Sequence, residues 1–169
     1  MPIPFLLEGN MINKELEDKI NKQLVIPAEL IAYEPNVTEE QLKRIMELLE
    51  AKKYKQFYQC GSWRKVRADI ISLYHSECIL CKLQGKITTH DHRLKSGEYR
   101  GLQVHHMLEI EYKSNHDYCL TPVVNGKANL IPVCQVHHNL LHNKSENIIK
   151  AKNKFIRQDT PLPSHTYLR

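Results

Sequence analysis

The chain of 169 residues lacks any apolar run that approaches the roughly 20 residues of a membrane-spanning helix. It also lacks an internal repeat and a low-complexity tract. Residues 1–7 are apolar but include no basic region and no clear cleavage site, so we expect mature protein rather than a secretory signal. With 41% hydrophobic residues, the chain has enough apolar side chains for one folded domain with an accessory segment, and no membrane partner is expected.

The cysteines do not suit a disulfide framework. There are five of them, an odd number, and Cys78 and Cys81 are separated by only two residues. This spacing is typical of a metal clamp, and the absence of a secretory signal favours a reducing compartment. Cys60 and Cys119 lie outside any metal-ligand spacing, and we expect them to be buried or indifferent thiols.

Charge is unevenly distributed along the chain. Residues 1–50 hold 5 Lys/Arg and 10 Asp/Glu, whereas residues 51–169 hold 19 Lys/Arg and 9 Asp/Glu, a net charge of +10. Clustered positive charge attracts polyanions and contributes non-specific phosphate binding. A solvated basic surface would show the same composition, so charge alone leaves both interpretations open.

Two helices are predicted before the first cysteine pair. Thr38 and Gln41 form a capping box, and the apolar stripe that follows predicts a helix from residue 39 to about 56. Ser62 is expected to cap a second helix, with Arg64, Lys65 and Arg67 largely on its polar side. The buried face of that helix is predicted to consist of Trp63, Val66, Ile70, Ile71 and Tyr74.

The remaining pattern predicts short strands and loops. We expect a strand over residues 102–109, a turn at Asn125-Gly126, a strand over 130–133 and a helix over 135–143. Residues 83–101 are polar and predicted to form a loop that includes His90 and His92. A weak helical pattern covers 13–24, and a lysine-rich helix is expected after Ser145.

The first set of metal-ligand spacings combines Cys78-x2-Cys81 with Cys134-x2-His137. Two such pairs can close a tetrahedral Cys3His site, which is the usual form of a structural zinc site. Zinc binding then contributes directly to folding, by on the order of 10 kcal/mol in small zinc modules.

The second set comprises His105, His106, Asn129, His138 and His142. His138 and His142 are four residues apart on the predicted helix, so they share a face and can clamp a metal. Adjacent residues on a strand point to opposite faces, so only one of His105 and His106 can easily face the same metal. The other imidazole is available as a general base. One enlarged zinc cluster, or surface histidines with ordinary partners, are the alternatives.

Residues 57–143 resemble the HNH endonucleases of the ββα-metal fold, especially small bacteriophage and prophage members. The similarity rests on Trp63-Arg64 with the following Arg67, on Cys78-x2-Cys81, on residues 104–107 and on the stretch from Asn129 to His142. It implies an α+β fold with a ββα-metal, treble-clef-like core, a structural zinc and an N-terminal helical segment.

The resemblance also implies individual roles. His106 would be the general base, His105 the adjacent metal ligand, and Asn129 the residue that braces the loop around the base. His138 would be the last signature histidine and a metal ligand, with His142 as a further ligand or phosphate contact. His137 occupies a position where relatives usually carry the fourth zinc cysteine.

The resulting prediction is a DNA endonuclease that uses Mg²⁺, Mn²⁺ or Ni²⁺ and leaves 5′-phosphate and 3′-hydroxyl ends, with Arg64 and Arg67 on phosphates. We expect an accessory segment over 1–56, a nuclease domain over 57–145 and a basic tail over 146–169. A cytoplasmic setting in a bacterial or phage-infected cell is implied, with DNA packaging or nicking beside a terminase as one role. A non-catalytic zinc-stabilised DNA-binding module and a toxin or restriction-type nuclease remain alternatives.

Overall fold

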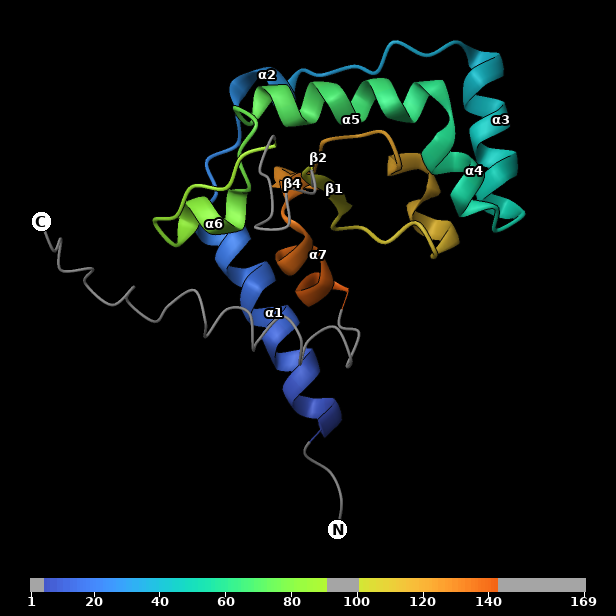
Figure 1. The fold of residues 1–169 in the computed structure, drawn as a ribbon. Coiled ribbons are helices and arrows are strands. Elements are labelled where there is room, and N and C mark those ends of the chain that lie inside the picture. Colours follow the sequence, from blue (N-terminus) through green and yellow to red (C-terminus); the bar gives the residue numbers. More distant parts are fainter. Residues whose placement is uncertain (1–4, 91–100, 143–169) are drawn as a thin grey trace, which may run out of the picture.

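The computed structural model describes residues 5–90 and 101–142, with side chains described from residue 14 onward. This part of the chain is a mixed α+β fold with two small sheets (Figure 1). Its elements, in chain order, are α1 (Phe5–Gln23), α2 (Ala28–Ile31), α3 (Glu39–Glu50), α4 (Tyr54–Gln59), α5 (Gly61–Leu73), α6 (Ile79–Leu83), β1 (Gln103–His106), the 3-10 helix η1 (Lys113–Tyr118), β2 (Val123–Val124), β3 (Lys127–Ala128), β4 (Leu130–Val133) and α7 (Gln135–Leu141).

The central sheet consists of the antiparallel strands β1 and β4, with His105 opposite Ile131 and His106 opposite Leu130. Between them the chain forms η1 and a second, smaller sheet of β2 and β3. The turn of that small hairpin confirms the prediction at Asn125 and Gly126, because both have positive φ angles, 50° and 73°.

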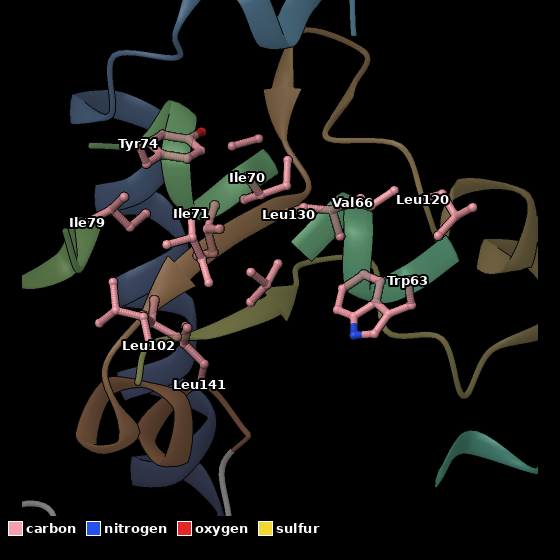
Figure 2. Close-up of a cluster of buried hydrophobic side chains, with 14 of the residues drawn as sticks. Trp63, Val66, Ile70, Ile71, Tyr74, Ile79, Leu102, Leu120, Leu130 and Leu141 are labelled. Atoms are coloured by element: carbon pink, nitrogen blue, oxygen red, sulfur yellow. The ribbon is translucent and has the colours of Figure 1, made fainter. Parts of the chain in front are cut away.

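Helix α5 lies across the central sheet and supplies much of the core. Figure 2 shows Val66, Ile70 and Ile71 of this helix close to Leu130, whereas Trp63 lies apart from them at one side of the cluster. All five residues predicted for the buried face of this helix are buried. Truncating the fully buried Ile70 to Ala is therefore expected to cost about 2–5 kcal/mol.

The N-terminal segment shares this core. Ile20 and Leu30 are each 1% exposed and belong to the same cluster as Trp63. Helix α1 lies beside α7 (Figure 1), and the hydroxyl of Tyr33 donates a hydrogen bond of 2.7 Å to Asp69 on α5. A weak helical pattern was predicted over residues 13–24, and α1 covers Phe5–Gln23, with Ile20 packed in the shared core.

The helix predicted from 39 to about 56 is shorter than expected. Its capping box is confirmed by reciprocal hydrogen bonds between Thr38 and Gln41. The helix ends at Glu50, however, because the chain turns through Lys52 with φ of 56° and starts α4 at Tyr54. The predicted helix therefore corresponds to two helices, α3 and α4, separated by this turn.

The predicted cap of the second helix was also wrong. Helix α5 begins at Gly61, one residue before Ser62, and its N-cap is Cys60. The Cys60 sulfur accepts a hydrogen bond from the backbone N–H of Trp63 at 3.4 Å. A thiol therefore takes the place usually filled by a hydroxyl or a carboxylate.

The C-terminal elements agree with the prediction apart from their ends. Strand β4 has the expected bounds, while β1 is shorter than expected and stops at His106. Two residues later, the Leu108 N–H bonds to the side chain of Asn129 rather than to backbone. Helix α7 ends at Leu141, with His142 at its C-cap. His92 and the lysine-rich helix expected after Ser145 lie outside the described residues. Among the described helices, none has the length and apolar character needed to cross a membrane.

Candidate metal centres

The first candidate centre lies where two short helices begin. Cys78 is the N-cap residue of α6 and Cys134 the N-cap residue of α7. Cys81 and His137 follow three residues later, in the first turn of each helix. These four side chains place one ligand atom each within 4.8 Å of one another. The paired spacings therefore converge because each helix presents its cap and its first turn to the same point.

The distances within this cluster match a tetrahedral ion. The His137 Nδ1 lies 3.5 Å from the sulfurs of Cys78 and Cys81 and 3.3 Å from that of Cys134. The sulfurs of Cys81 and Cys134 are 3.9 Å apart. A tetrahedral ion with bonds of about 2.3 Å to sulfur and about 2.0 Å to nitrogen would place sulfur and nitrogen about 3.5 Å apart, and two sulfurs about 3.8 Å apart. The cluster could therefore hold a metal such as zinc.

Hydrogen bonds within this cluster shift the pKa values of its side chains in opposite directions. Hydrogen bonds with Cys78 and Cys81 hold the pKa of Cys134 well below its usual range. Burial lowers the pKa of His137, but hydrogen bonds with Cys134 and Cys81 outweigh burial and raise this pKa to about 9. The Thr88 hydroxyl adds a hydrogen bond of 3.3 Å to the Cys81 sulfur. Such donors stabilise thiolate ligands from outside the coordination shell.

The second candidate centre is formed by His105, His138 and His142. His105 comes from β1, and the two other histidines come from the last turn of α7 and its C-cap. The Nε2 atoms of His138 and His142 are 3.1 Å apart, and the ring centroids of His105 and His142 are 4.8 Å apart. The structure therefore brings together the three histidines predicted as catalytic-metal ligands, and they form a cluster separate from the cysteines.

The environment of His105 fits a role as a neutral ligand. Its side chain is only 5% exposed, and its Nδ1 is buried without a hydrogen-bond partner in the described part of the chain. Burial, followed by the neighbouring His142 and His138, holds the pKa of His105 well below its usual range. An unprotonated imidazole with an unsatisfied nitrogen is the form that binds metals.

His106 occupies the opposite face of β1. Its ring stacks on Trp63, with centroids 4.8 Å apart and planes 23° apart. Its Nε2 lies 2.8 Å from the carbonyl oxygen of Cys119, so this nitrogen is the donor and carries the proton. Burial lowers the pKa of His106 to about 4, despite the opposing effect of that hydrogen bond. With the proton on Nε2, Nδ1 holds the lone pair of the ring.

Asn129 connects the segments on either side of His106. Its side chain is 1% exposed and fully hydrogen-bonded. The Oδ1 accepts the N–H of Leu108 at 2.9 Å, and Nδ2 donates to the carbonyls of Tyr118 and Thr121 at 3.0 and 2.9 Å. Asn129 therefore ties the chain that leaves β1 to the chain around Cys119, whose carbonyl holds His106.

The predicted phosphate-binding residues differ in their surroundings. Arg64 is exposed, as is Lys65, on the outer side of α5. Arg67 is half-buried, and its guanidinium donates to the carbonyl of Leu102 at 2.6 Å. Arg67 therefore anchors the chain entering β1, whereas Arg64 and Lys65 present their charge to solvent.

Sequence reasoning missed three contributors to these centres: the thiol cap of Cys60, the Cys119 carbonyl and the stacking of Trp63 on His106. None has a spacing signal, because each depends on tertiary contact. Comparison with family models, with curated proteins and with solved structures finds no match for this chain. Function is therefore inferred from the chain's own residues.

Proposed function

We propose that this protein is a metal-dependent endonuclease of the HNH type, with a ββα-metal core formed by β1, β4 and α7. One observation carries the proposal. The adjacent residues His105 and His106 face different environments. His105 joins His138 and His142 in a cluster of imidazoles, whereas His106 stacks on Trp63 and has one ring nitrogen bonded to the Cys119 carbonyl. A phosphodiesterase needs both of these in neighbouring positions.

The proton-handling half of the site is His106. Because Nε2–H is bonded to the Cys119 carbonyl, the tautomer is fixed and Nδ1 keeps its lone pair. In the proposed reaction, Nδ1 accepts a proton from a water molecule as the water oxygen bonds to phosphorus. The bond between phosphorus and the 3′-oxygen breaks, and the 3′-oxygen takes a proton from solvent and leaves as a hydroxyl group. Asn129 keeps the two supporting chain segments in place.

The metal-binding half consists of His105, His138 and His142. A divalent ion bound there would supply a Lewis acid to the scissile phosphate. Three neutral ligands leave the full positive charge of the ion available to an anionic substrate. Imidazole ligands favour ions such as Ni²⁺ in binding, while Mg²⁺ and Mn²⁺ prefer oxygen ligands. All three ions should therefore be assayed.

The cysteine cluster serves a structural purpose in this proposal. Its four protein ligands complete a tetrahedron and leave no open position for substrate. A zinc ion there would join the starts of α6 and α7, and α7 carries two of the three histidines. Zinc thus stabilises the helix that presents the other metal.

DNA is the proposed substrate because the region with these clusters is also the basic part of the chain. Exposed Arg64 and Lys65 offer phosphate contacts, which position DNA without reading its sequence. Packaging or nicking beside a phage terminase, with the acidic N-terminal segment as a protein-binding surface, is the proposed setting.

The test is cleavage of supercoiled plasmid by the purified protein with Mg²⁺, Mn²⁺ or Ni²⁺, with and without a chelator. Nicked or linear DNA is expected only with added metal. His138→Ala should be inactive, and His75→Asn should be active. His75 is exposed, lies outside both clusters and has φ of 59°, a conformation that Asn tolerates. DNA binding without cleavage under all conditions would replace the nuclease with the zinc-stabilised binding module.

A further inference from the structure

The tryptophan of this chain contacts the proposed general base. Trp63 is the sole tryptophan in the sequence, lies in the first turn of α5 and is 3% exposed. Its ring is nearly parallel to that of His106, at 4.8 Å between centroids and 23° between planes. The α5 start is itself fixed, because the Trp63 N–H bonds to the Cys60 sulfur.

Other groups near His106 constrain it differently. Phe57 and Tyr58 approach at 6.0 and 6.2 Å with planes tilted by 53° and 62°, so they fill space beside the ring without lying flat on it. The Cys119 carbonyl fixes the direction of one nitrogen. A single hydrogen bond still allows the imidazole to swing about the N–H···O axis, and the χ2 torsion of histidine is soft. The flat indole face is the contact that opposes this swing.

We propose that Trp63 is a positioning residue that sets the plane of the His106 ring, so that Nδ1 points to the attacking water. This inference rests on the proposed nuclease function. It assigns Trp63 no contact with substrate, metal or reacting atoms. Its effect is on the fraction of time that His106 holds the productive orientation.

The expected kinetic signature is specific. Replacing Trp63 with Leu should lower kcat by about 10- to 100-fold, the range expected when a reacting group is misplaced by about 1 Å. KM and the metal content of the histidine cluster should not change, since Trp63 contacts neither. Trp63→Phe should recover part of kcat because it restores a flat face.

Ring protons of His106 provide a readout that needs no activity. Protons held over the face of an indole resonate upfield, and the shift depends on stacking geometry. In protein with both metals bound, NMR should show upfield His106 ring resonances, assigned by their loss in His106→Gln. They should move downfield in Trp63→Leu and less so in Trp63→Phe.

Tyr74→Leu is the matched control, since it removes a buried aromatic ring at the other end of α5. It should lower the melting temperature but leave kcat and the His106 resonances unchanged. If Trp63→Leu does not fold, Trp63→Met and Trp63→Phe form the comparison, and Met should be the slower. Unchanged kcat, or His106 resonances that do not move, would overturn the positioning role. An inactive wild-type protein with upfield His106 resonances would instead refute the nuclease proposal and leave the stacking intact.

Discussion

His137 and His138 are neighbours on α7 but belong to different clusters. The Nδ1 of His137 lies 3.3 Å from the Cys134 sulfur, whereas the Nε2 of His138 lies 3.1 Å from that of His142. Successive residues on a helix are rotated by about 100°, so one short helix can face two sites. Both clusters therefore take side chains from the same short helix.

The first prediction concerns the structural zinc. Cys78→Ser and Cys134→Ser should each release zinc and unfold the C-terminal elements, because zinc binding contributes on the order of 10 kcal/mol in such small modules. Zinc content by mass spectrometry and thermal unfolding would measure this. Cys60→Ser is the control, since Ser is a good N-cap and Cys60 lies outside the cluster. Full zinc content with unchanged melting temperature in the cluster variants would rule out the site.

The second prediction concerns the coupling between the two centres. Removing zinc from the cysteine cluster should also weaken Ni²⁺ binding by the histidines, because α7 carries His138 and His142. His138→Ala should lose Ni²⁺ binding yet keep its zinc. Calorimetric titration of Ni²⁺ into zinc-loaded and zinc-depleted protein measures both effects. Equal Ni²⁺ affinity in the two forms would show that the centres are independent.

The third prediction concerns DNA binding. Added salt should weaken DNA binding steeply. In the double variant Arg64→Ala, Arg67→Ala, the slope of the logarithm of the binding constant against the logarithm of the salt concentration should be shallower by about 0.9 for each phosphate that the protein no longer neutralises. The structure predicts different effects of the two arginines on stability. Arg67→Ala should also lower stability because it releases the Leu102 carbonyl, whereas Arg64→Ala should not. An unchanged slope in the double variant would remove α5 from the DNA interface.

The residues of the two candidate metal centres were predictable because their spacing is local. Cys78 and Cys81 converge within one helical turn, as do Cys134 and His137, and His138 and His142 are one turn apart. The opposite orientations of His105 and His106 follow from strand geometry alone. The antiparallel pairing of β1 with β4 brings these pairs of ligands together. It was implied by the resemblance of the combined motifs to the HNH family, and no single motif predicts it.

Features that depend on tertiary contact were not predictable. Helix α1 is stabilised by packing of residues such as Ile20 in the shared core, which its weak pattern does not reveal. Lys52 interrupts a continuous helical pattern by adopting a positive φ, and Cys60 caps α5 in place of Ser62. Trp63 was expected in the core, but nothing in the spacing indicates that its partner is His106.

The division of labour between His105 and His106 is the central claim, and one paired measurement tests it most directly. Plasmid cleavage and calorimetric metal titration should be carried out on His106→Ala and His105→Ala, with the structural zinc counted separately. His106→Ala should keep the second metal but lose roughly 10²–10⁴-fold in cleavage rate, the usual effect of removing a general base. His105→Ala should lose both metal and cleavage. If His106→Ala loses the metal while His105→Ala keeps it, the roles are reversed, and if both variants cleave DNA like the wild type, the endonuclease account is contradicted.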